Sequence, residues 1–204
     1  MVQLSESQIG KIGFFGGTFD PPHNGHLSLL QFALDKFALD RVLLSPSFST
    51  PLRKNAPLYT PQQRLHMVEK LAKLHPGAMV FDYEISQTKL SYTYDSILEV
   101  RNFFPRSKIH LLIGYDQFKQ LTKWKFLKEL SEEVHFLVFK RDGTPNAPPP
   151  ISISYSLMKN PLINISSSLI RSRIRDGKSI EGLVPPAIFS YLQSIIHATQ
   201  SISS

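Results

Sequence analysis

Residues 12–27 read IGFFGGTFDPPHNGHL, and this pattern predicts a short buried strand, a glycine turn and the start of a helix. Gly16 and Gly17 end the strand, where the lack of a side chain lets the backbone come close to a ligand. Exposed N–H groups and the dipole at a helix start attract anions. His23 and His26 are three residues apart, so both rings can face the same spot. We therefore expect an active site for an anionic ligand here.

Strand and helix patterns alternate along the rest of the chain. Runs of apolar residues predict strands at 12–15, 41–44, 78–85, 108–114, 134–139 and 162–165. Apolar residues at helical spacing predict helices at 27–39, 61–74, 91–104, 115–130, 169–175 and 187–196. Such alternation is typical of an α/β fold with a doubly wound, mostly parallel sheet. We expect a single domain over residues 1–198, with a small helical part from about residue 166 and a polar tail at 199–204.

Helix starts and loops add candidate binding groups. Thr60 followed by Pro61 is typical of a helix start, and Ser91 or Thr93 is expected to cap the next helix. In a parallel sheet, ligands bind beyond the carboxyl ends of the strands, where the strand order changes direction. The segments that follow strands are therefore candidates, and they are 16–26, 46–54, 114–116 and 166–171.

Composition limits the classes of protein to which the chain can belong. The 204 residues fit one domain, and the absence of cysteine excludes disulfides and thiolate sites. A net charge of +7 favours anionic partners such as nucleotides, nucleic acids or acidic lipids. The sequence shows no stacked-aromatic RNA-binding signature, no apolar run of membrane-spanning length and no secretory signal. We therefore expect a cytoplasmic protein without a nucleic-acid or membrane partner, and a monomer and a homodimer both stay open.

Several kinds of catalytic site lack their motif in this sequence. It has no GxxxxGK(S/T) loop of a P-loop NTPase, no GxGxxG turn in its opening stretch and no GxSxG elbow. His23 and His26 could hold a metal ion with Asp20 as a third ligand, although their spacing is not that of known zinc helices. They could also simply pack. We favour a third interpretation, in which both imidazoles donate hydrogen bonds to phosphate oxygens.

Two motifs near opposite ends of the chain resemble those of a nucleotidyltransferase superfamily. GGTFDPPHNGH at 16–26 is similar to its H-x-G-H motif, and ISSSLIR at 165–171 is similar to its I-S-S-T/S-x-x-R motif. Within this superfamily, the chain resembles the nicotinate-mononucleotide adenylyltransferases of the bacterial type through further landmarks in the family's order. They are SPSFSTPLRK at 45–54, Glu84, SYT at 91–93, IGYD at 113–116, Trp124 and RDG at 141–143.

The resemblance implies a Rossmann-like fold and a reaction in which ATP and nicotinate mononucleotide give the deamido-dinucleotide and pyrophosphate. It implies Mg2+ as cofactor, held mainly by the phosphates and not by protein side chains. Among the catalytic residues, His26 would contact the α-phosphate and His23 would help to hold the triphosphate, while Lys54 and Arg171 would bind other phosphate oxygens. The implied phosphate-binding group is Gly16, Gly17, Thr18, Phe19, Ser166, Ser167 and Ser168.

For the mononucleotide, the resemblance implies a group made of Tyr92, Thr93, Asp116 and Trp124. Thr93 and nearby backbone N–H groups would receive the nicotinate carboxylate at a helix start. Asp116 would bond a ribose hydroxyl or approach Mg2+, and Trp124 would either stack on the pyridine ring or pack in the core. Tyr115 departs from the family pattern, since a small residue is expected there.

Two other functions stay open on the sequence. One is adenylyl or cytidylyl transfer to another phosphate acceptor, such as phosphopantetheine, although relatives of that kind are usually shorter and lack the SYT and Trp landmarks. The other is a nucleotide-binding regulator without catalysis, which the presence of both histidines, Lys54 and Arg171 disfavours.

Overall fold

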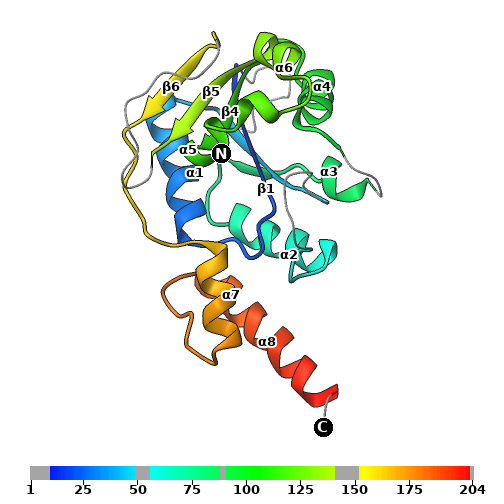
Figure 1. Ribbon diagram of the computed structural model, residues 1–204, viewed down its shortest axis with the longest axis vertical. Helices are drawn as coiled ribbons and strands as arrows, with labels where there is room; N and C mark the ends of the chain where they lie inside the picture. The colour runs from blue at the N-terminus through cyan, green and yellow to red at the C-terminus, as the bar shows by residue number, and fades with distance from the viewer. Residues whose placement is uncertain (1–9, 49–55, 88–90, 141–151, 203–204) are drawn as a thin grey trace.

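The structure is a computed structural model that describes residues 10–48, 56–87, 91–140 and 152–202. Within these residues, one sheet has the strand order β3-β2-β1-β4-β5-β6, and each neighbouring pair is parallel (Figure 1). The strands are β1 Lys11–Gly17, β2 Arg41–Pro46, β3 Ala78–Val80, β4 Lys108–Gly114, β5 Val134–Phe139 and β6 Tyr155–Met158. The predicted α/β fold with a doubly wound parallel sheet is confirmed.

Helices cover both faces of this sheet. They are α1 Asn24–Phe37, α2 Pro61–Ala72, α3 Tyr83–Ser86, α4 Thr93–Phe103, α5 Tyr115–Phe118, the 3-10 helix η2 Leu121–Lys123, α6 Leu127–Glu133, α7 Ser167–Arg175 and α8 Pro186–Ile202. Helices α1 and α2 pack on one face, and α4 and α6 pack on the other (Figure 1). None of the helices in the described part of the chain has the length and apolar character that crossing a bilayer requires.

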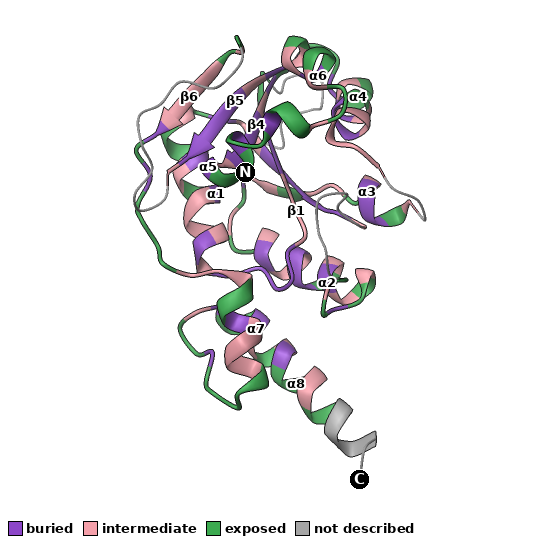
Figure 2. Cartoon of the chain, viewed as in Figure 1, coloured by how far each residue is buried: buried purple, intermediate pink, exposed green. Residues whose placement is uncertain are grey.

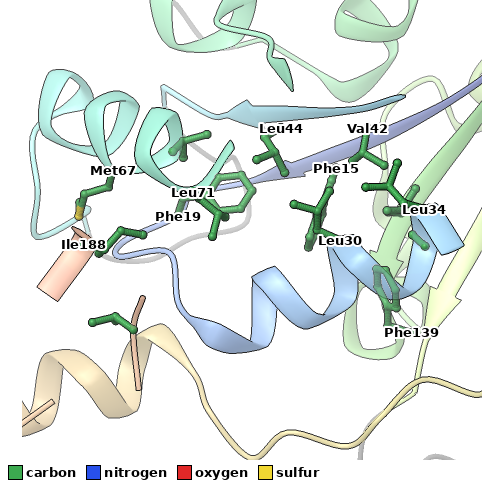
Figure 3. Close-up of a cluster of buried hydrophobic side chains, with 14 of the residues drawn as sticks. Phe15, Phe19, Leu30, Leu34, Val42, Leu44, Met67, Leu71, Phe139 and Ile188 are labelled. Atoms are coloured by element: carbon green, nitrogen blue, oxygen red, sulfur yellow. The ribbon is translucent and has the colours of Figure 1, made fainter. Parts of the chain in front are cut away.

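Side chains that alternate along each strand divide the core into two layers. In β1, Phe14 belongs to one layer and its neighbour Phe15 to the other. Phe15 lies beside Leu30 of α1 in the first layer, which also contains Met67 of α2 (Figure 3). Phe14 packs in the second layer, which includes Ile97 of α4. Both faces of the central strands are therefore buried, as Figure 2 shows and as parallel sheets require.

The strand order changes direction beside β1. Strands β2 and β3 follow on one side of β1, whereas β4, β5 and β6 lie on its other side. The carboxyl ends of β1 and β4 meet at this change, and the connections that leave them run to different faces of the sheet. In sheets of this kind a crevice for a ligand forms at that point.

Two of the predicted strands differ from the structure. The strand predicted at 78–85 ends at Val80, because the chain then turns into the short helix α3, which buries Ile85. No strand lies at 162–165, and the last strand of the described sheet is β6. This strand is at the edge of the sheet, and of its four residues only Met158 is buried.

The helix predicted at 115–130 is broken into α5, η2 and α6. Phe126 has a φ of 59°, which lies in the left-handed region that the interior of an α-helix excludes. No glycine or proline marks this break in the sequence. The break leaves Trp124 outside any helix, between η2 and α6.

Capping follows the prediction at α2 and departs from it at α4. Thr60 caps α2 as predicted, since its Oγ1 accepts the backbone N–H of the third helical residue at 3.2 Å. The cap of α4 is Tyr92, and neither Ser91 nor Thr93 has that position. Tyr92 has this position because the carboxylate of Asp95, in the first turn of α4, accepts the backbone N–H of Tyr92 at 3.0 Å.

Helices α7 and α8 form a helical part at the bottom of the view in Figure 1. Ile170 and Ile188 from these helices pack against the first core layer. The backbone of α8 is helical to Ile202, beyond the helix end predicted at 196. The limits predicted for the domain and the polar tail at 199–204 stay predictions.

Candidate active site

Two cavities lie at the carboxyl end of the sheet and share a wall. The first cavity has a volume of about 600 Å³, and the second has a volume of about 740 Å³. Gly16, Gly17, Thr18 and Gln117 line both of them. The glycines end β1, and Gln117 lies in α5 directly after β4. The shared wall is therefore at the change in strand order, where a ligand is expected.

The first cavity collects residues from the start of α4 and from the break before α6. Tyr92 and Thr93 stand at the N-terminus of α4, and Trp124 lies at the break. Trp124 is half-buried, so it packs on the second core layer and also lines the cavity. Three of the four residues predicted to bind a mononucleotide thus line one cavity, whereas Asp116 lines the second.

Charged side chains complete the first cavity. Lys123 and Lys125 line it, and neither was singled out in the sequence. The Nζ of Lys125 lies 4.7 Å from the centroid of the Tyr92 ring, a distance at which an aromatic face stabilises a cation. Glu84 lines the same cavity, is buried, and accepts a hydrogen bond from Ser96 Oγ at 2.6 Å.

Burial changes the acidity of two groups at the site. It raises the pKa of Glu84 above the ordinary value of 4.5, more than its hydrogen bond from Ser96 lowers it, and the charge of Asp95 adds to the increase. Burial also raises the pKa of Tyr59 to about 12, with the charge of Asp20 adding to this shift and a nearby guanidinium opposing it. The Tyr59 hydroxyl therefore stays protonated at neutral pH.

The second cavity brings together the motifs from the two ends of the chain. Beyond the shared wall, the predicted residues that line it are Phe19, His23, His26, Asp116, Ser166, Ser167, Ser168 and Arg171. Every residue of the predicted phosphate-binding group therefore lines this cavity. Lys54, from the predicted catalytic group, lies outside the described residues, and its role stays a prediction.

Backbone geometry fixes the two histidine rings. His23 caps α1, and its ring centroid lies 3.8 Å from that of His26, so the rings meet at one spot as predicted. The backbone N–H of His23 donates to Nδ1 of His26 at 3.1 Å. A neutral His26 ring therefore carries its hydrogen on Nε2, which can donate to an acceptor. Gly25 leaves room for this arrangement, because a Cβ there would lie 2.9 Å from Nδ1 of His23.

Arg171 joins α7 to the loop after β1. Its Nη1 donates to the backbone oxygen of Asp20 at 2.7 Å and lies 3.4 Å from the carboxylate of the same residue. Its Nη2 donates to Ser168 Oγ at 3.1 Å. Ser167 Oγ donates to the backbone oxygen of Pro21 at 2.9 Å. These contacts hold the N-terminus of a nine-residue helix beside the histidines, where its dipole and the guanidinium both favour an anion.

Asp20 has a role that the sequence did not reveal. It is 1% exposed, and its two carboxylate oxygens accept the backbone N–H groups of Leu58 and Tyr59, each at 3.0 Å. The carboxylate thus ties the turn before α2 to the loop after β1. This use makes Asp20 a poor third ligand for a metal ion on the two histidines. The described residues also contain no group of three or more His, Cys, Asp or Glu that could hold a metal ion.

Comparison with known proteins gives a family and several relatives. A family model described as cytidylyltransferase-like matches residues 14–173. A protein of Gemmatimonas aurantiaca named probable nicotinate-nucleotide adenylyltransferase is 36% identical over 191 residues, which are 90% of each chain. A protein of Geobacillus thermodenitrificans with the same name is 36% identical over 185 residues, which are 91% of this chain and 84% of that protein.

Two solved structures share the fold. Nicotinic acid mononucleotide adenylyltransferase of Plasmodium falciparum, complexed with NaAD, has a TM-score of 0.76 and 19% identity, over 91% of this chain and 96% of that one. The same enzyme complexed with APC has a TM-score of 0.74 and 18% identity, over the same shares of the two chains. At this identity, the likeness shows the fold alone.

We predict that Glu84→Gln becomes more stable relative to the unsubstituted chain as the pH rises. The folded chain holds the Glu84 proton more tightly than the unfolded chain, so its stability falls as the pH rises from 4.5 through the raised folded pKa. Glutamine has no such proton, and its carbonyl oxygen can still accept from Ser96. Thermal unfolding followed by circular dichroism from about pH 4 to about pH 8 measures the difference in Tm. A difference that stays constant over this range would contradict the prediction.

Proposed function

Since this chain belongs to the cytidylyltransferase-like family and, within it, to the nicotinate-nucleotide adenylyltransferases, we propose that it transfers the adenylyl group of ATP to nicotinate mononucleotide. The products are deamido-NAD and pyrophosphate. One observation carries the proposal for this structure: the two cavities share a wall at Gly16, Gly17 and Thr18. Two nucleotides in these cavities would meet at that wall, so that the phosphate of one can attack the α-phosphate of the other.

The reaction needs no general base. The second pKa of a phosphate monoester is near 6, so the acceptor phosphate is largely a dianion at neutral pH. One of its oxygens forms a bond to the α-phosphorus of ATP, and the bond from that phosphorus to the bridging oxygen breaks. Pyrophosphate leaves with the electron pair. The protein therefore has to align the two phosphates and to stabilise negative charge.

The groups on the second cavity suit this charge. In our proposal, His26 donates from Nε2 to the α-phosphate, a role that the hydrogen bond at its Nδ1 supports. His23 and the glycine backbone hold the triphosphate nearby. Arg171 and the N-terminus of α7 bind the β- and γ-phosphates, and Lys54 adds a further charge. The adenosine lies farther along the same cavity.

Mg2+ fits the second cavity as a partner of the phosphates. This ion prefers oxygen ligands and keeps several of its waters, so one carboxylate and phosphate oxygens can complete its shell. We propose that the phosphates hold it mainly and that Asp116, whose half-exposed carboxylate lines this cavity, approaches it or a ribose hydroxyl. When bound, Mg2+ neutralises charge on the phosphate groups. The cytoplasmic location expected from the sequence stays a prediction.

The first cavity suits the mononucleotide acceptor. We propose that Trp124 stacks on the pyridine ring and that Tyr92 and Thr93 bring the helix N-terminus of α4 to the carboxylate. Lys125 places a positive charge over the ring of Tyr92, beside the same helix end. A cation attracts a carboxylate and not a neutral carboxamide, so this cavity favours nicotinate over nicotinamide.

Release of pyrophosphate from ATP tests the proposed function. Nicotinate mononucleotide, nicotinamide mononucleotide and phosphopantetheine are offered separately, and we expect the highest kcat/KM with nicotinate mononucleotide. Highest activity with phosphopantetheine, or with CTP in place of ATP, would make the chain a transferase of another specificity. ATP binding without release for any acceptor would instead indicate a nucleotide-binding regulator.

His26→Ala should lower kcat about 10²- to 10³-fold, the usual cost of removing one donor to charge that develops in a transition state. KM for ATP should change far less, because other groups also hold the triphosphate. Steady-state kinetics with both substrates measures the two effects. His197→Ala is the control, since this exposed residue of α8 lines neither cavity and its substitution should leave kcat unchanged. Normal turnover in His26→Ala would refute the role proposed for His26.

Lys125→Met should narrow the preference for nicotinate over nicotinamide mononucleotide by about 5-fold, the factor that corresponds to ~1 kcal/mol for an ion pair open to solvent. Methionine keeps the length of the side chain and removes its charge. The ratio of kcat/KM for the two acceptors measures the preference. Lys128→Met is the matched control, because Lys128 is exposed on α6 and lines neither cavity. An equal change in kcat/KM for both acceptors would mean that Lys125 does not recognise the carboxylate of nicotinate.

A further inference from the structure

Arg64 on α2 is fully buried beside the wall that the two cavities share. Its side chain is 0% exposed, which is unusual for a cation. The guanidinium donates to four backbone oxygens from three segments of the chain. They belong to Thr18 (2.8 Å), Ser47, Phe48 (3.1 Å) and Tyr59 (3.2 Å).

Two of the four carbonyl groups that Arg64 binds belong to residues that line the candidate site. Thr18 follows β1 and lines both cavities, whereas Ser47 follows β2 and lines the first. Nη1 donates to both of their oxygens, so one nitrogen atom joins the ends of two neighbouring strands. A guanidinium is planar and its N–H groups point in fixed directions. Arg64 therefore adds a link between two strand ends that a backbone hydrogen bond from Ser47 N–H to the Gly17 oxygen (2.9 Å) already joins, and it fixes the positions of the Thr18 and Ser47 carbonyl groups.

A second route leads from Arg64 to the phosphate-binding groups. Tyr59 gives its backbone oxygen to Arg64 and its backbone N–H to the carboxylate of Asp20. Asp20 in turn lies 3.4 Å from the guanidinium of Arg171, which lines the second cavity. A displacement of Arg64 would therefore shift residues that line both cavities. It would act on the first cavity through Ser47, and on the second through Tyr59, Asp20 and Arg171.

A packing role alone is a poor explanation of this residue. Moving a cation out of water is costly, and an apolar side chain of similar volume fills a core without that cost. The four carbonyl oxygens offset the cost only while they keep their positions around the guanidinium. The interaction thus stabilises one arrangement of the strand ends over others.

We propose that Arg64 is a positioning residue, which holds the two cavities at the separation that aligns the acceptor phosphate with the α-phosphate of ATP. This proposal rests on the proposed function. Arg64 itself does not touch substrate, since it acts through Thr18 and Ser47. A misplacement of reacting groups by about 1 Å can cost about 10²-fold in rate, so a small change in these carbonyl positions would lower turnover.

Arg64→Lys tests the proposal. Lysine keeps the charge, but its three N–H donors sit on one nitrogen and cannot span four carbonyl oxygens as a planar group does. We expect kcat to fall by about 10- to 100-fold, while KM for ATP and for nicotinate mononucleotide changes much less. Circular dichroism shows whether the variant is folded. Arg64→Gln, which keeps a planar donor group, is the second variant if Arg64→Lys does not fold.

Arg101→Lys is the matched control. The guanidinium of Arg101 donates to the backbone oxygen of Ser107 at 2.6 Å, before β4 and therefore at the opposite end of the sheet. It lines neither cavity. Its substitution should lower Tm and leave kcat unchanged.

A folded Arg64 variant with normal kcat would overturn the proposal, and so would a rise in both KM values without a loss of turnover. If the unsubstituted chain is active with a different phosphate acceptor, the acceptor named in the proposed function is wrong. The role of Arg64 is then decided by comparing kcat of the Arg64 variant and of the unsubstituted chain with that acceptor. If no acceptor supports release of pyrophosphate by the unsubstituted chain, both proposals fail.

Discussion

The buried carboxylate of Asp20 holds together the parts of the chain on which both cavities depend. It accepts the backbone N–H groups of Leu58 and Tyr59, and it lies beside the guanidinium of Arg171, which follows 151 residues later in the chain. Together with the hydrogen bond from Ser167 Oγ to the backbone oxygen of Pro21, this link holds the N-terminus of α7 beside the start of α1. The charge is buried, but hydrogen bonds and a cation surround it, which is how a buried carboxylate is stabilised.

A second buried charge, of opposite sign, complements the first. Arg64 binds backbone oxygens where Asp20 binds backbone N–H groups, and both charges meet the backbone of Tyr59. The loops around the site are therefore positioned by charged groups that point inward. The histidines, serines and Arg171 that line the second cavity are the groups that we propose bind the phosphates. These buried contacts explain how the glycine-containing segment after β1 keeps a defined shape at the wall of both cavities.

Local patterns in the sequence predicted much of the fold. Contacts between residues far apart in the chain could not be predicted from it. The apolar runs of β1, β4 and β5 and the cap at Thr60 were found in the sequence, and so were the motifs that line the second cavity. The break in the helix predicted at 115–130 was missed, because a left-handed Phe126 has no signal in composition. Arg64 was missed for a related reason: its partners are backbone atoms from remote segments, which leave no mark on residue type.

We propose that one dinucleotide product spans the two cavities that meet at the end of β1. A crystal structure of the chain with deamido-NAD tests it most directly. We predict the nicotinate ring beside Trp124 in the first cavity, the adenosine in the second, and the pyrophosphate bridge at Gly16, Gly17 and Thr18. A dinucleotide held entirely within one cavity, or bound away from the carboxyl end of the sheet, would contradict this claim.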